Sequence, residues 1–288
     1  MTAATRESIS RTEPQSERAR GEPRPGRALL AILLRDYLVT RSYRGALTTD
    51  FAFGAVNILI YYFISQTFEG AATADLSGAP SYFDFAAVGL VVTMVVTAAA
   101  TGMARRMREE QLTGTLELLA AQPVRTWELF AGLGALPFLL AGVRAVIYLL
   151  LAALLLDLET SQASWLGLAA ILLATGAAMS ALGMVAGSVV LVAKRGEIVI
   201  AALLTAMGLV GGAFFPIEVL PSWLQPVGEI VPTRFAYDGL RAALFRGGDW
   251  EGDALVLLAF AAVCLPAAVW LGGRALDFTR RRGSLSQY

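Results

Sequence analysis

The sequence predicts an all-α membrane protein with six transmembrane helices. Of its 288 residues, 56% are hydrophobic and only 16% are charged, whereas soluble domains carry about 25% charged residues. The charges stand in short clusters, and the apolar stretches between them approach the roughly 20 residues that cross a bilayer. The predicted spans are about residues 46–68, 83–104, 130–156, 165–193, 198–215 and 254–276.

The basic residues predict the orientation of these spans. Cytoplasmic loops are enriched in Lys and Arg, and basic residues follow the second, fourth and sixth spans, whereas the loops after the first and third contain none. This alternation predicts that both termini are cytoplasmic. We expect a multi-pass protein of the cell (inner) membrane. The long segment 216–253 is the exception, because it carries Arg234, Arg241 and Arg246 but faces outside by parity.

Two segments flank the first span. Residues 1–26 are polar and rich in Arg, Glu, Ser and Pro, and we expect a disordered cytoplasmic tail. Residues 27–44 predict a helix lying in the cytoplasmic interface, although a basic lead-in to the span is the alternative. Its apolar face would consist of Leu30, Leu33, Leu34, Tyr37 and Leu38. Residues 283–288 form a C-terminal cytoplasmic tail by the same topology.

The loop after the second span contains a further helical pattern. Leu112, Leu116 and Leu119 follow helical spacing, and Pro123 would end the helix. A short helix with an apolar face and projecting acids, fixed between two spans, could transmit the push of a peripheral partner. A solvated helix that packs only against its own spans is the alternative.

The segment 211–241 contains four prolines, which preclude one continuous span. Its aromatic residues, among them Phe214 and Phe215, suit the membrane interface. A broken helix at membrane depth must be buried by protein or hydrated by a cavity. We therefore expect this segment to cap the outer end of a pathway, with an ordinary interfacial loop as the alternative.

Several classes of function are disfavoured by what the sequence lacks. It has no histidine and one cysteine, Cys264, so a Cys-based metal site or a disulfide within the chain is excluded. No two carboxylates stand at helical spacing within the spans, which argues against an intramembrane enzyme. A net charge of zero offers no general attraction for nucleic acid. Arg144 is the clearest charge within a span, and it should face a pathway or a subunit interface rather than lipid.

Two motifs resemble the membrane subunits of type-2 ATP-binding-cassette (ABC) exporters. The loop EEQLTGTLELLAAQP is similar to the family's cytoplasmic pattern E-x-x-x-G-T-L-E-x-L-x-x-x-P. The segment GGAFFPIEVLPSWLQPVGEIVPTRFAYDGLR resembles the stretch after the family's fifth span, where short extracellular helices dip back into the membrane. The resemblance covers nearly all of residues 27–282, which would form one type-2 transmembrane domain.

The resemblance implies specific partners and site residues. ATP and Mg would be used by a separate nucleotide-binding subunit, because the chain has no Walker A motif and needs no cofactor of its own. A second permease copy, as a homodimer or a related half, would complete the transporter in the lipid bilayer. Coupling to the ATPase is assigned to Glu110, Gly114, Thr115, Leu116 and Glu117. The pathway or interface is assigned to Arg144, Phe214, Phe215, Pro216 and Glu218.

The implied activity is outward movement of a drug, lipid or polysaccharide, without catalysis by this chain. Which acid faces the ATPase stays open, because this loop begins with Arg108, Glu109 and Glu110, where the family often has a Glu-Arg pair. The alternative function is an ATP-independent secondary transporter or a channel-like protein. That alternative predicts internal repeats or paired ionisable residues in the spans, and the sequence has neither.

Overall fold

The computed structural model describes residues 26–42, 44–68, 76–122, 124–193 and 196–282, and these residues form helices and short connections with no strand. Both predicted tails lie outside them, apart from Gly26. Every predicted span corresponds to a helix. The long helices are α2 (Arg44–Phe68), α3 (Tyr82–Leu112), α5 (Thr126–Leu155), α6 (Trp165–Ala193), α7 (Gly196–Val210) and α10 (Glu251–Arg282).

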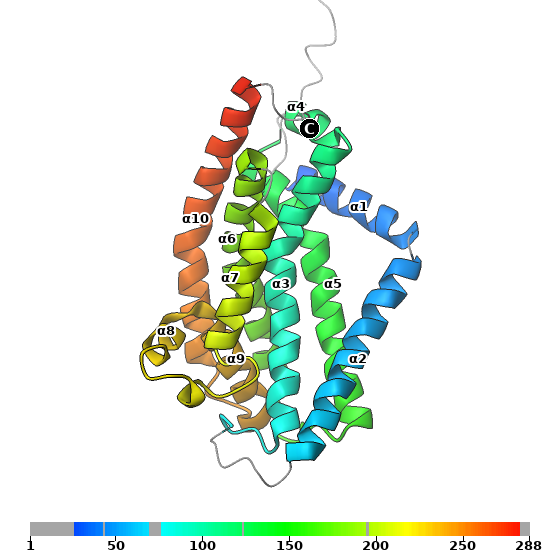
Figure 1. Ribbon diagram of the computed structural model, residues 1–288. Coiled ribbons are helices and arrows are strands. Elements are labelled where there is room, and N and C mark those ends of the chain that lie inside the picture. The colour runs from blue at the N-terminus through cyan, green and yellow to red at the C-terminus, as the bar shows by residue number, and fades with distance from the viewer. Residues whose placement is uncertain (1–25, 43, 69–75, 123, 194–195, 283–288) are drawn as a thin grey trace, which may run out of the picture.

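These helices run along a common long axis (Figure 1). Helix α1 (Arg27–Ser42) lies across one end, close to α4 (Thr115–Ala121), and we call this the α4 end. The opposite end, the α9 end, carries three short helices. They are η2 (Ile217–Val219), α8 (Gln225–Ile230) and α9 (Pro232–Arg241), and a π-helical turn η3 (Ala242–Arg246) follows.

Four of the predicted spans are confirmed by length and composition: α3, α5, α6 and α10 are each long and apolar enough to cross a membrane. Helix α2 is long enough, but Asp50, Asn57 and Gln66 interrupt its apolar sequence. Helix α7 is apolar but has only 15 residues. The protein is therefore an all-α membrane protein in which four helices of the described residues are long and apolar enough to cross a membrane.

Helices α3 and α6 form the centre of the bundle. The apolar stretch of α3 that could cross a membrane is 78% buried within the protein, whereas that of α10 is 22% buried. Because lipid is as apolar as a protein core, such helices associate through close packing and small residues. Gly89 on α3 illustrates this, since a Cβ atom added there would lie 1.7 Å from the Ala213 carbonyl oxygen.

Helix α1 has two distinct faces, as the sequence predicts. Leu30, Leu34 and Leu38 are more than half exposed, and this exposed apolar face suits a membrane interface. The opposite face packs on α5, where Ile32 is buried against Gly132. Asp36 is also buried, at 2% exposure, and its Oδ1 pairs with Arg35 at 2.8 Å.

Candidate functional site

The helical segment predicted after the second span is divided between the end of α3 and the separate short helix α4. Helix α3 ends at Leu112, and Gly114 then adopts φ +71°, a left-handed conformation that favours glycine. Helix α4 starts at Thr115 in a new direction. This break changes the predicted apolar face: Leu116 is fully buried, but Leu112 is 61% exposed. The prediction that Leu112 packs with Leu116 is therefore wrong. Pro123 lies outside the described residues.

Glu110 holds this connection from the inside. It is only 8% exposed, and its carboxylate accepts hydrogen bonds from Arg35 on α1, at 2.5 Å, and from Thr115 on α4. Burial by itself lowers the pKa of Arg35, but the hydrogen bonds and charges of Asp36 and Glu110 outweigh it and leave that pKa raised. Glu110 therefore links α1, α3 and α4 rather than pointing to solvent.

The outward face of α4 carries different residues. Glu117 and Leu118 are both exposed, and Leu118 retains 68% of its accessible surface. Of the predicted coupling residues, Thr115 and Leu116 face the protein, and Gly114 forms the break. Glu117 is the predicted carboxylate that is available to a partner, and Leu118 is an apolar neighbour that the sequence analysis did not single out.

The start of α5 is fixed by a carboxylate as well. The helix begins at Thr126, and the side chain of Glu128 in its first turn caps it. Glu128 is 2% exposed and accepts hydrogen bonds from the backbone N–H groups of Arg125, at 3.2 Å, and Gly26, at 2.6 Å. The α4 end is thus tied together by buried carboxylates on α3 and α5.

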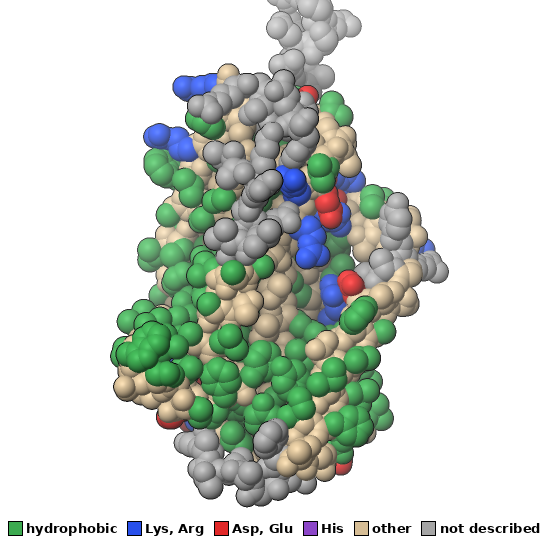
Figure 2. All heavy atoms as spheres, viewed as in Figure 1, with side chains coloured by type: hydrophobic (Ala, Val, Ile, Leu, Met, Phe, Trp, Pro, Cys, Tyr) green, Lys and Arg blue, Asp and Glu red, His purple; other side chains and the backbone are tan. Residues whose placement is uncertain are grey.

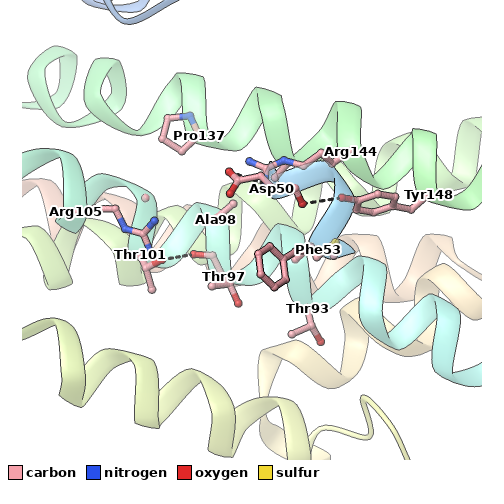
Figure 3. Close-up of a pocket in the computed structure, with 13 residues that line it drawn as sticks. Asp50, Phe53, Thr93, Thr97, Ala98, Thr101, Arg105, Pro137, Arg144 and Tyr148 are labelled. Atoms are coloured by element: carbon pink, nitrogen blue, oxygen red, sulfur yellow. Dashed lines mark hydrogen bonds and ion pairs between the residues drawn. The ribbon is translucent and has the colours of Figure 1, made fainter. Parts of the chain in front are cut away.

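Two cavities of about 450 and 420 Å³ that share lining residues lie between α2, α3 and α5, and the second also borders Val39 and Thr40 of α1. We call them together the α2–α3–α5 groove. Both are lined by Asp50, Gly102, Arg105, Pro137 and Arg144. In Figure 3, Asp50 and Arg144 lie side by side, and Thr97 and Thr101 follow along α3 toward Arg105. The groove therefore combines charged, hydroxyl and apolar surfaces within the bundle.

Arg144 lies on the groove side of α5. Its guanidinium lies 3.5 Å from the carboxylate of Asp50, and its side chain is 24% exposed. Tyr148, one turn further on, donates a hydrogen bond to the backbone oxygen of Phe51 at 3.1 Å. On the other side of α5, Val143 and Val146 are exposed and line a fully apolar surface groove. Arg144 thus lies on the polar side of α5, and its assignment to a pathway or subunit interface stays a prediction.

Of the two predicted aromatic residues at the α9 end, Phe214 packs against a long helix. Phe214 stacks on Tyr61 of α2, with ring centroids 5.1 Å apart. Phe215 is partly buried and Pro216 is buried. Glu218 is exposed and borders a small polar cavity of about 50 Å³. Pro216 and Glu218 line this cavity together, whereas Phe214 and Phe215 do not.

Arg241 is the residue that the sequence analysis missed. It is 1% exposed, and its Nη2 donates to the carbonyl oxygens of Gly212 at 2.9 Å, Ala213 at 3.2 Å and Phe85 at 3.3 Å. Its guanidinium also lies over the Phe85 ring, 3.5 Å from the centroid. One side chain thereby joins α9, the end of α7 and the start of α3. Arg241 lies in the segment 216–253, which carries arginines although it is predicted to face outside. This exception could have indicated that one of its arginines is buried.

A bundle of long apolar helices with a partly polar groove between them is the architecture of a polytopic membrane protein. Residues 27–245 match the model of the ABC-2 type transporter family, so the chain belongs to this family. It is also similar to the inner membrane transport permease YadH of Escherichia coli K12 and of Shigella flexneri. Each is 25% identical over 189 residues, which cover 65% of this chain and 72% of the relative. The chain is accordingly a membrane transport permease.

Proposed function

We propose that this chain is the permease subunit of an ABC exporter, which moves a drug, lipid or polysaccharide outward. A separate nucleotide-binding subunit would hydrolyse ATP with Mg, and a second permease copy or a related half would complete the assembly. Residues 27–282 would form one non-catalytic transmembrane domain with six spans, including α2 and α7, flanked by cytoplasmic tails. The observation that carries this proposal is the exposed pair Glu117 and Leu118 on the short helix α4.

The position of α4 supports contact with an ATPase. Leu116 is buried in the core of the α4 end, and Glu110 connects Thr115 to α1. A partner that pressed on Glu117 and Leu118 would therefore move a helix that is firmly joined to the bundle. Figure 2 shows Lys, Arg, Asp and Glu side chains gathered toward the α4 end of this face, whereas hydrophobic side chains cover much of the rest. An arginine-rich end is the one that faces the cytoplasm.

The double substitution Glu117→Lys with Leu118→Ser should release the ATPase. It reverses one exposed charge and removes one exposed apolar contact, so the permease itself should fold and insert normally. A hydrogen bond to a charged group contributes about 1.5–3 kcal/mol, and its loss should reduce retention of the partner roughly tenfold or more. Co-purification of the tagged permease with a co-expressed candidate ABC ATPase measures the effect.

The matched control is Glu229→Lys with Ile230→Ser on α8. Glu229 and Ile230 are also an exposed acid followed by an exposed apolar residue, but they lie at the α9 end. The control should retain the ATPase fully. Equal retention by both double variants would remove α4 as the point of contact. Gly114 is a poorer test position, because any side chain there strains the backbone at φ +71°.

Orientation can be tested with single cysteines in a Cys264→Ala background. A membrane-impermeant thiol reagent applied to intact cells should label cysteine at Gln162, which is exposed at the α9 end. Cysteine at Thr113, exposed at the α4 end, should react only after the membrane is opened. Labelling of Thr113→Cys from outside would reverse the proposed orientation.

A further inference from the structure

We propose that the α2–α3–α5 groove binds an amphipathic anion, whose charged group is held by Arg105 and Arg144. The apolar part of the molecule would lie along Phe53, Met94 and Pro137, which line the same groove. This inference rests on the proposed export function and names the class of substrate. It concerns the groove and not the contact with the ATPase.

The charges of the groove favour an anion. Its two carboxylates are already paired, Asp50 with Arg144 at 3.5 Å and Glu109 with Arg106 at 3.1 Å. Arg105 is exposed to the groove, and none of the carboxylates that the structure describes forms an ion pair with it. One guanidinium is therefore left to bind a ligand, and guanidinium groups bind phosphate and carboxylate in two-pronged geometry.

The second arginine can contribute to the same ligand. Arg144 lines both cavities of the groove together with Arg105. The guanidinium of Arg144 would then be shared between Asp50, 3.5 Å away, and the bound anion. Arginine keeps its charge at any accessible pH, so the positive charge that attracts the anion does not depend on pH.

The shape and lining of the groove favour a molecule with an apolar part. Cavities of 300–1,000 Å³ are typical of small-molecule sites, and those of the groove are about 450 and 420 Å³. Thr97 and Thr101 place hydroxyl groups beside the arginines, and apolar side chains complete the wall. The neighbouring groove on the outer side of α5 has no polar lining, so it offers nothing to hold a charged group.

Photocrosslinking of the purified permease, without its ATPase, tests the inference. The probe is dodecyl phosphate with a diazirine on its chain, presented in neutral phosphatidylcholine nanodiscs. Crosslinks should map to α2, α3 and α5 at the groove. Excess plain dodecyl phosphate should compete for labelling, whereas equal concentrations of dodecyltrimethylammonium or inorganic phosphate should not.

The variants separate the groove from general attraction to arginine. Arg105→Gln should lower the crosslinking yield about tenfold, and Arg105→Lys should retain much of it. The matched control is Arg274→Gln on α10, because Arg274 stacks on Trp270, 4.7 Å from the ring centroid, and does not line the groove. Arg105 is exposed, so its substitution should leave the melting temperature unchanged.

Three results would overturn the inference. Equal competition by the cationic amphiphile would show that the negative charge is not recognised. Equal competition by inorganic phosphate would show that the alkyl chain of the probe contributes nothing to binding. Unchanged labelling of Arg105→Gln would place the site elsewhere. None of these results concerns retention of the ATPase, so failure here and failure of the proposed function are read in separate experiments.

Discussion

Replacement of Arg241 by leucine should destabilise the protein more than any other single charge removal among the described residues. The change leaves the carbonyl oxygens of Phe85, Gly212 and Ala213 without their shared donor in a buried place. A buried acceptor left unsatisfied costs about 1–3 kcal/mol, and three acceptors lose their donor in this variant. We expect the melting temperature of the detergent-solubilised permease to fall by roughly 10 °C or more.

Arg234→Leu is the control for this prediction. Arg234 stands on the same helix and pairs with Asp238 at 3.2 Å, but its side chain is 31% exposed. An exposed ion pair contributes about 1 kcal/mol or less, so this variant should melt near the unchanged protein. Arg241→Lys should lie between the two, because lysine lacks the planar fork that spans several acceptors. Similar melting temperatures for Arg241→Leu and Arg234→Leu would refute the structural role of Arg241.

Gly89→Ala should have a comparably large effect through packing. The added Cβ would lie 1.7 Å from the carbonyl oxygen of Ala213, which is a backbone atom and cannot rotate away. Overpacking of a well-filled core is destabilising by about 1–3 kcal/mol and at times more. Because the displaced carbonyl is also an acceptor for Arg241, we expect a loss at the upper end of this range. Thermal unfolding followed by tryptophan fluorescence would measure it.

Gly142→Ala provides the opposite expectation. Gly142 is also within a long helix, but a Cβ added there would have no neighbour within 4 Å. Alanine favours a helix over glycine by about 0.5–1 kcal/mol, so this variant should be slightly more stable. If Gly89→Ala behaved like Gly142→Ala, the close crossing at Gly89 would have no energetic weight.

The long helices could be predicted from the sequence because their signal is local. An apolar stretch of sufficient length, bounded by charges or prolines, predicts a span without knowledge of its neighbours. The predicted span 165–193 coincides with α6, and α1 was anticipated from the spacing of its leucines. The same local reasoning overlooked that Asp50 and Asn57 weaken the membrane character of α2.

The partners of individual side chains could not be predicted in the same way. Glu110 belongs to the matching loop motif, and nothing local shows that Arg35, 75 positions away, occupies its carboxylate. Arg241 is separated from the Phe85 carbonyl by 156 positions. The helical spacing that grouped Leu112 with Leu116 assumed a continuous helix, and the positive φ of Gly114 broke it. These outcomes depend on tertiary contacts, which periodicity does not contain.

The junction at Glu110 has a mechanical consequence. The carboxylate of Glu110 accepts hydrogen bonds from both Arg35 and Thr115. A force applied to α4 is therefore transmitted both to α3, which runs along the bundle, and to α1, which lies across it. A force along the helix axes at α4 would also act in part on α1, which lies across this end of the bundle and exposes leucines. A displacement of α4 would therefore move α1 within the plane of the membrane, in addition to moving α3 along the helix axes.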